Sequence, residues 1–235
     1  MLQAALYLIP VPLSDGPASD VLPQRNIAIV SEIRHFIVEN VRSARRFLKK
    51  CNRNIDIDAL TFSTLDEHTR PEEVGAMLQP LRQGEAVGVI SEAGCPAIAD
   101  PGADAVAIAQ REGLKVIPLV GPSSILMSLM ASGFNGQSFA FIGYLPIEPQ
   151  QRQRKLHNMV QCINSLDQTQ IFIETPYRNN RLMAEMVKSL PPRLRLCVAS
   201  NITGLDETII TRTIGEWEHA KYDFDKIPTI FLLYK

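Results

Sequence analysis

Residues 86–133 read AVGVISEAGCPAIADPGADAVAIAQREGLKVIPLVGPSSILMSLMASG, and this stretch decides the fold class. It contains two short apolar runs, 86–90 and 116–120, which are typical of strands buried on both faces of a parallel sheet. Each run is followed by a loop of small residues and then by residues with helical spacing. The repeated order of strand, loop and helix predicts a parallel α/β sheet.

The two loops of this stretch are the first candidates for a binding site. Parallel sheets bind ligands at the carboxyl ends of their strands, so loops 91–101 and 121–124 are expected to face the same crevice. Their small residues let a ligand approach the backbone, and free N–H groups at a helix start attract a carboxylate or phosphate. The alternative is that both loops are ordinary strand-to-helix turns, because neither contains a phosphate-binding glycine-lysine signature.

Composition and charge exclude few classes of function. The formal net charge of −1 means that any polyanion must be bound by a local patch. The four cysteines have neither zinc nor redox spacing, which favours free thiols in a reducing cytoplasm. We expect no signal peptide, because the first residues lack a basic flank and soon meet proline. The apolar region after residue 116 is interrupted by glycine, proline and serine, so we expect no membrane span.

The rest of the chain continues the alternation of strands and helices. Further strands are expected at 4–9, 35–38, 60–65, 139–145, 170–173, 194–199, 208–213 and 228–233, and helices at 41–50, 71–83, 102–111, 123–132 and 179–190. No crossover helix fits between the last two strands, so we expect them to form an antiparallel pair in a mixed sheet. We place a boundary near Val120, between an N-terminal α/β domain (1–119) and a C-terminal one (120–235). The cleft between two such domains is the default ligand site.

Charged side chains give weaker signals. The expected helix 41–50 could contact RNA phosphates or could simply present a solvated face. Its cations are Arg42, Arg45, Arg46, Lys49 and Lys50. Residues 151–155 form a second basic cluster. The triplet Asp66-Glu67-His68 fits a proton-transfer or metal site, and loop polarity explains it equally well.

The order of the motifs resembles the tetrapyrrole methylase-like (class III) superfamily of S-adenosylmethionine-dependent methyltransferases. Within it, the ribosomal RNA small-subunit methyltransferase I branch, which methylates a ribose 2′-hydroxyl, is the most similar. The motifs are VISEAGCPAIADPG, VIPLVGPSSILMSLMASG, FAFIGYLP and IFIETPYR, with weaker matches at LYLIPVPL, EHT and the closing strands. The resemblance implies two α/β domains with S-adenosylmethionine bound in the cleft between them, usually in a homodimer. It also implies a cytoplasmic enzyme of rRNA processing, and we expect no metal site.

The resemblance also assigns cofactor-binding positions, mainly through backbone atoms. They are Pro10, Pro12, Ala93, Gly94, Cys95, Ile98, Ser123, Ser124, Glu174, Thr175, Pro228 and Thr229. The acceptor-side motifs depart further from the branch. Glu39 and Arg42 are kept from an Ala-Glu-Asp-Thr-Arg stretch, whereas its aspartate and threonine are replaced. A usual His-Glu-His-Asn is DEHT at residues 66–69, a usual Ser-Pro-His-Arg is TPYR at 175–178, and a usual Arg-Glu-Leu-Thr-Lys is SNITG at 200–204.

A hydroxyl acceptor must lose a proton during methyl transfer, so an acidic or imidazole side chain is expected near the crevice. Glu174 is the first choice and His68 the second, ahead of Glu39, Glu67 and Asp100; each acid could instead serve as a cap or in a salt bridge. Arg42, Arg45, Arg46 and Arg178 are the expected RNA-binding residues. The leading hypothesis is methylation of ribosomal RNA. Two alternatives stay open: a small cyclic, tetrapyrrole-like acceptor, and a non-catalytic cofactor-binding protein.

Overall fold

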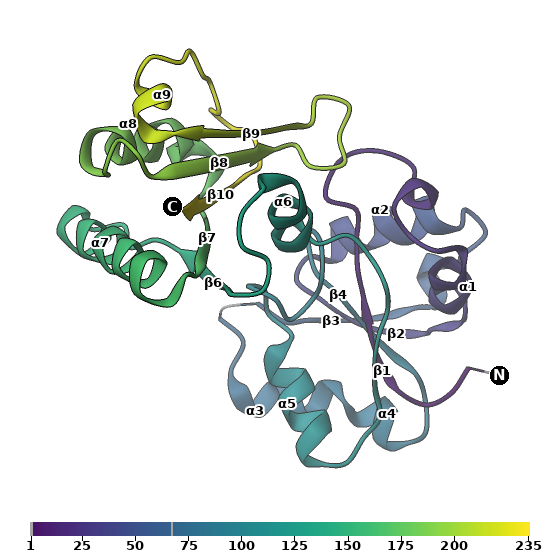
Figure 1. Ribbon diagram of the computed structural model, residues 1–235. Helices are drawn as coiled ribbons and strands as arrows, with labels where there is room; N and C mark the ends of the chain where they lie inside the picture. The colour runs from purple at the N-terminus through teal and green to yellow at the C-terminus, as the bar shows by residue number, and fades with distance from the viewer. Residues whose placement is uncertain (1, 67) are drawn as a thin grey trace. The chain divides into compact units, whose positions relative to one another are not determined.

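A computed structural model describes residues 2–66 and 68–235 and divides into two compact units, Met1–Ser123 and Ser124–Lys235 (Figure 1). The sequence places the boundary near residue 120. Each unit has its own sheet and hydrophobic core. In the part of the chain that the structure describes, no helix is both long and apolar enough to cross a membrane.

Within the described residues up to 123, five parallel strands form the first sheet, in the order β3-β2-β4-β1-β5. The strands are β1 (Leu6–Ile9), β2 (His35–Val38), β3 (Thr61–Thr64), β4 (Val87–Ile90) and β5 (Val116–Pro118). The predicted parallel sheet is confirmed. Because all five strands run the same way, the loops that follow them lie at one edge of the sheet.

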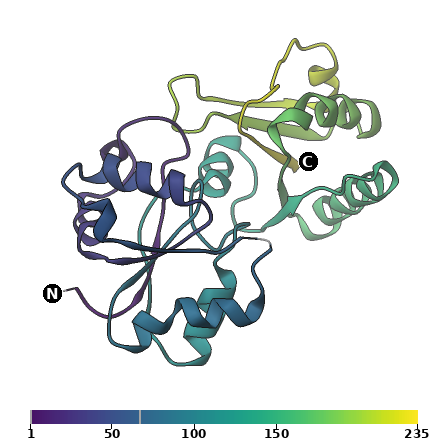
Figure 2. The same cartoon turned by 180° about the vertical axis from the view of Figure 1, so that it is seen from behind.

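Two helical layers cover the first sheet on opposite faces (Figure 2). On one face lie α1 (Gln24–Glu32) and α2 (Val41–Cys51), and on the other α3 (Pro71–Met77), α4 (Gln79–Arg82) and α5 (Ala103–Arg111). Short 3-10 helices, η1 (Ala18–Asp20) and η2 (Ile57–Ala59), lie in the connections. In the central strand β4, a Cβ at Gly88 would lie 2.7 Å from Ile9 Cδ1, so the packing of the neighbouring side chains requires glycine there.

The single helix predicted at 71–83 is wrong, because α3 and α4 are separated at Leu78. Proline at position 80 has no N–H with which to continue the i to i−4 hydrogen bonds, and its ring disfavours an uninterrupted helix. The sequence contains this signal, but the apolar spacing across it dominates the prediction.

Residues 124–235, all of which the structure describes, form a second five-stranded sheet in the order β6-β7-β10-β8-β9. The strands are β6 (Phe139–Tyr144), β7 (Thr169–Ile173), β8 (Arg195–Ser200), β9 (Thr208–Thr213) and β10 (Thr229–Tyr234). Only β6 and β7 pair in parallel, so the predicted mixed sheet is confirmed. The predicted pairing of the last two strands is wrong: β10 lies between β7 and β8, and β9 pairs with β8 at the edge. The nearly fully buried run of β10 suits the centre, and the half-exposed β9 suits an edge.

On one face of the second sheet lie α7 (Pro149–Leu166), α8 (Asn179–Ser189) and α9 (Ile214–Glu218), and their apolar side chains form one core with Phe172 and Phe231. On β9 and β10 lies α6 (Ser124–Ser132), and the Thr211 hydroxyl donates to the Ser132 carbonyl at 2.9 Å. The 3-10 helix η3 (Pro176–Arg178) leads from β7 into α8.

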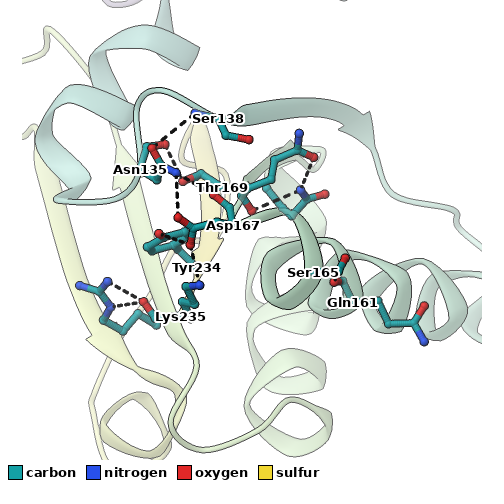
Figure 3. Close-up of polar contacts among 11 residues, drawn as sticks. Asn135, Ser138, Gln161, Ser165, Asp167, Thr169, Tyr234 and Lys235 are labelled. Carbon is teal, nitrogen blue, oxygen red and sulfur yellow. Dashed lines mark hydrogen bonds and ion pairs between the residues drawn. The ribbon is translucent and has the colours of Figure 1, made fainter.

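A polar network closes the second unit where α7 ends (Figure 3). Asp167 adopts a left-handed conformation, φ 53°, and its Oδ1 accepts from the Tyr234 hydroxyl at 2.7 Å and the Lys235 ammonium at 2.6 Å. The Asn135 amide donates to the Asp167 carbonyl, and the buried Thr169 hydroxyl donates to the Asn135 carbonyl at 2.9 Å. This network joins the start of β7 to the end of β10.

Candidate functional site

Three loops at the carboxyl edge of the first sheet are packed against one another. Val11 and Gly94 exchange two backbone hydrogen bonds, of 2.9 and 3.1 Å, which join the loops after β1 and β4. The Cys95 thiol lies 3.4 Å from the carbonyl oxygen of Pro122, in the loop after β5. A Cβ at Gly121 would lie only 2.3 Å from Cβ of Pro10, so the Gly121 backbone packs directly against the Pro10 ring. Of the cofactor-binding positions predicted in the first unit, these contacts involve Pro10, Gly94 and Cys95, and the remaining ones, Pro12, Ala93, Ile98 and Ser123, lie in the same three loops.

The loop after β4 has an unusual backbone. Within residues 91–102, all of which the structure describes, positive φ angles occur at Gly94 (72°), Ala97 (66°), Ala99 (61°) and Gly102 (125°). Each alanine costs about 1–2 kcal/mol in this region, because its Cβ approaches the following carbonyl. Strained residues of this kind cluster at active sites and ligand clamps. The sequence shows no sign of strain at Ala97 and Ala99, since alanine favours neither a turn nor a positive φ.

An acidic cluster lies beside this loop. Asp100 faces the charges of Glu39, after β2, and Glu92, and the Ser91 hydroxyl hydrogen-bonds to it. Burial, together with the charges of Glu39 and Glu92, raises the pKa of Asp100 to about 6, although the hydrogen bond from Ser91 opposes the shift. The Ser43 hydroxyl donates to Glu92 at 3.0 Å. In the sequence Asp100 is only one of several candidate bases, and the charges around it distinguish it in the structure.

The loop after β3 holds the Asp66 and His68 pair. Asp66 Oδ1 accepts from the His68 backbone N–H at 2.9 Å and from the Thr69 hydroxyl at 3.0 Å, and these hydrogen bonds lower the pKa of Asp66. The His68 side chain is exposed. Glu67, a further candidate base, lies outside the described residues. Among the residues that the structure does describe, no group of His, Cys, Asp and Glu side chains could hold a metal ion.

The cations of α2 lie on an exposed face, opposite its buried Ala44, Phe47 and Leu48. Asn40 caps the start of the helix, and its side chain accepts hydrogen bonds from the N–H groups of Arg42 and Ser43. The Arg45 guanidinium lies over the Phe62 ring at 5.5 Å, which holds the charge at the surface. The second basic cluster, 151–155, is not a continuous surface, because Arg152 is buried and pairs with Glu185 at 2.6 Å.

In the second unit, Ser124 is the first residue of α6, and the other predicted residues lie where β7 ends and β10 begins, since Ile230 pairs with Ile173. The Glu174 side chain is 2% exposed, and its Oε1 accepts from Arg178 Nη2 at 2.6 Å and Nε at 3.0 Å. The same oxygen accepts the Thr175 N–H at 2.7 Å. The Thr229 hydroxyl lies 3.2 Å from that of Ser200. The sequence analysis missed the pairing of Glu174 with Arg178, although carboxylate and guanidinium four residues apart give a detectable signal.

These contacts change the interpretation of two candidates. Arg178 neutralises Glu174, so neither side chain is a free charge. The assignment of Glu174 as a base and of Arg178 as an RNA contact stays a prediction. The prediction that the residues of the second unit share one cofactor with those of the first also stays open.

Solved structures identify the fold. Diphthine synthase is similar over 98% of this chain and 89% of its own, with a TM-score of 0.66 and 14% sequence identity. Uroporphyrin-III C-methyltransferase from Thermus thermophilus, complexed with S-adenosylhomocysteine, is similar over 98% of this chain and 97% of its own, with a TM-score of 0.58 and 14% identity. The fold is therefore that of the tetrapyrrole methylase-like methyltransferases. No family model matches the sequence.

Curated relatives of similar sequence establish the family of this chain. The ribosomal RNA small subunit methyltransferase I of Vibrio cholerae is 30% identical over 211 residues, which cover 90% of this chain and 69% of the relative. The enzyme of the same name from Halalkalibacterium halodurans is 30% identical over 92% of this chain and 71% of its own length. The chain belongs to the ribosomal RNA small subunit methyltransferase I family of S-adenosylmethionine-dependent methyltransferases. The predicted family and enzyme class are confirmed.

Proposed function

We propose that this enzyme transfers a methyl group from S-adenosylmethionine to a ribose 2′-hydroxyl of ribosomal RNA in the small subunit. The observation that carries the proposal is the identity of 30% across 90% of the chain with a relative that bears this substrate in its name. The ribose hydroxyl as acceptor atom rests on the motif resemblance. A cytoplasmic location and a homodimer belong to the same proposal.

The carboxyl edge of the first sheet fits the cofactor. Pro10, Pro12, Ala93, Gly94, Cys95, Ile98 and Ser123 would hold it from this unit, and Ser124, Glu174, Thr175, Pro228 and Thr229 from the other. The fit rests on small residues and on closely packed loops: a Cβ at Gly94 would lie 3.2 Å from Leu13 Cδ2, so glycine lets the loops after β1 and β4 approach each other. When bound, S-adenosylmethionine supplies an electrophilic methyl group.

Positioning would provide most of the rate enhancement, on the order of 7–11 kcal/mol in ideal cases, provided that the acceptor oxygen is aligned with the methyl group. The packed loops after β1, β4 and β5 supply a rigid surface for that alignment. The acceptor hydroxyl must also lose its proton. A base works best when its pKa lies near the working pH, and Asp100, with a pKa of about 6, meets this condition.

In this proposal, Asp100 replaces Glu174, the first choice from the sequence, as the group that accepts the proton, and Glu174 has a positioning role. Oε1 of Glu174 already accepts four hydrogen bonds, two from Arg178 and two from the backbone N–H and hydroxyl of Thr175, so the carboxylate holds the start of η3 in place. His68 stays a second candidate for the base because its side chain is exposed. On the surface, Arg42, Arg45 and Arg46 would contact RNA phosphates.

The decisive experiment measures transfer of a labelled methyl group to small ribosomal subunits from a strain that lacks this enzyme. We expect label in ribosomal RNA, resistant to alkaline cleavage at one ribose. Uroporphyrin III provides the comparison for the small cyclic acceptor, and label there but not in RNA would replace the proposed substrate. Binding of S-adenosylmethionine by calorimetry, without transfer to either acceptor, would favour the non-catalytic alternative.

A further inference from the structure

The second unit contains a hollow that takes no part in the proposed cofactor site. It lies between α7 and the end of α8, where the chain turns toward β8, and has a volume of about 660 Å³. Sites for small ligands and nucleotides range from about 300 to 1,000 Å³. The buried ion pair of Arg152 with Glu185 joins α7 to α8, the two helices beside the hollow.

Polar donors and amides line this hollow together with apolar side chains. We call the apolar lining residues Leu156, Leu190 and Pro191 the floor, and the polar ones the wall. Side chains that can donate and accept hydrogen bonds line the wall, namely Gln150, Gln153, Arg154, His157 and Asn158. None of the residues that line the described hollow is an aspartate or glutamate. Its chemistry therefore favours an anion that also carries a flat apolar part and hydrogen-bonding edges.

Arg154 is the charged residue of the wall. Its guanidinium makes no hydrogen bond or ion pair with the residues that the structure describes. Glu148, the acid whose pKa its charge helps to lower, is engaged in the helix cap, where its carboxylate oxygens accept the N–H groups of Gln150 and Gln151 at 3.0 and 2.7 Å. A guanidinium that lies at a hollow without such a partner suits a phosphate, to which it can donate two parallel hydrogen bonds.

His157 adds a second donor. Its Nε2 lies 3.1 Å from the Gln161 amide nitrogen, and in the tautomer that accepts this hydrogen bond the proton is on Nδ1. The Nδ1–H can then donate to a phosphate or to a base. The amides of Gln153 and Asn158 present both a donor and an acceptor, which is the combination that base edges require.

We propose that this groove, which we call the α7–α8 groove, binds a single-stranded segment of the RNA substrate. Arg154 and His157 would contact the phosphate, the amides would contact base edges, and a base would rest on the Leu156 and Leu190 floor. Single-stranded RNA fits better than a duplex, because only unpaired bases can turn their edges and faces into a pocket. This inference rests on the proposed function, since it assigns a second contact for the same RNA. Helix α8 connects Arg178 with the rim of the groove. It begins beside Arg178 and extends roughly 16 Å over its 11 residues.

The test uses the full-length protein and a short single-stranded RNA of mixed sequence, about ten nucleotides long. Arg154→Glu is compared with Lys155→Glu, which changes the net charge equally on the adjacent residue of the same helix but outside the groove. By fluorescence anisotropy, we expect Arg154→Glu to weaken RNA binding about tenfold or more and Lys155→Glu about twofold or less. We also expect Arg154→Glu to reduce the slope of log affinity against log salt by about 0.7 for each phosphate that the groove no longer neutralises.

His157→Ala, combined with Asn158→Ala, tests the uncharged wall. We expect weaker RNA binding with an unchanged salt slope. Equal effects of Arg154→Glu and Lys155→Glu would overturn the proposal, because they would show that RNA affinity depends on the general charge of the surface and not on the groove. Equally tight binding of a polyglutamate peptide, with the same weakening in Arg154→Glu, would assign the groove to an acidic protein and would also overturn it.

The two proposals fail in different ways. If the wild-type enzyme does not methylate small subunits, the proposed function fails. If it methylates them, and Arg154→Glu leaves both RNA affinity and the KM for subunits unchanged while calorimetry shows normal cofactor binding, only the groove proposal fails.

Discussion

The loop after β4 and the Asp167 network both contain polar side chains at the ends of strands. They differ in the charged and polar groups that surround their aspartates, Asp100 and Asp167. Asp167 lies between a hydroxyl and an ammonium, and the hydrogen bonds from Lys235 and Tyr234 lower its pKa. Burial and the charges of the nearby Glu39 and Glu92 raise the pKa of Asp100 to about 6. The first arrangement stabilises the folded chain. The second destabilises it, in a loop with strained alanines, which indicates that the loop serves a purpose other than stability.

The strongest test of this comparison removes the charge of Asp100. If Asp100 is the base, Asp100→Asn should lower kcat for methyl transfer by about 10²–10⁴, the usual contribution of a general base. In the wild type, kcat should rise with pH and level off above about 6, as Asp100 ionises. Labelled transfer across this pH range checks both statements. A mutant that keeps most of its kcat would exclude Asp100 and leave His68, the second candidate, as the proposed base.

The second test concerns the contact between the loops after β1 and β5. Gly121→Ala places a Cβ 2.3 Å from Cβ of Pro10, so the two loops must move apart. We expect a decrease of about 1–3 kcal/mol in the free energy of unfolding and roughly tenfold weaker S-adenosylmethionine binding by calorimetry.

Gly16→Ala is the matched control for this test, because a Cβ at Gly16 meets no atom within 4 Å. It should change neither stability nor affinity measurably. If both variants behave alike, the contact between Pro10 and Gly121 does not shape the cofactor site.

The third test removes one hydrogen bond from the Asp167 network. Thr169→Val keeps the shape of the side chain but removes the hydroxyl that donates to the Asn135 carbonyl. We expect it to lower the free energy of unfolding by about 1–2 kcal/mol, measured by urea denaturation, because Thr169 is buried and the Asn135 carbonyl loses its donor. The kcat per folded molecule should not change. A large fall in kcat would mean that the network is coupled to the chemistry, contrary to the comparison.

The smallest effect concerns stability and pH. Because the pKa of Asp100 is raised in the folded chain, the folded state binds a proton more tightly than the unfolded state. The wild type should therefore lose stability as the pH rises from about 4 to about 6, and stay constant above that range as far as Asp100 is concerned.

Asp100→Asn should remove this pH-dependent destabilisation. After allowance for partial solvent screening, we expect it to be more stable than the wild type by about 1 kcal/mol at pH 7.5, with no difference below pH 4. Thermal unfolding at several pH values measures both differences. A gain that does not depend on pH would show that burial and like charge at Asp100 are not its cause.

The sequence predicts the first sheet well because its strands are short continuous apolar runs, a pattern that parallel packing requires. It predicts the second sheet less well. β9 and β10 differ chiefly in burial. Their order in the sheet depends on which of the two packs against the core at the centre of the sheet. The strain at Ala97 and Ala99 is invisible in the sequence. The burial of Arg152 is equally hidden, because its partner, Glu185, is 33 residues away.

The double hydrogen bond between Val11 and Gly94 has a consequence for evolution. Since the two residues exchange both of their backbone partners, the loops after β1 and β4 must keep their lengths up to this bridge, or both hydrogen bonds break together. Insertions and deletions among related chains should therefore fall beyond Val11, in the exposed residues 15–17, rather than between Ile9 and Val11. One pair of amides thus fixes where the family can vary the length of this loop.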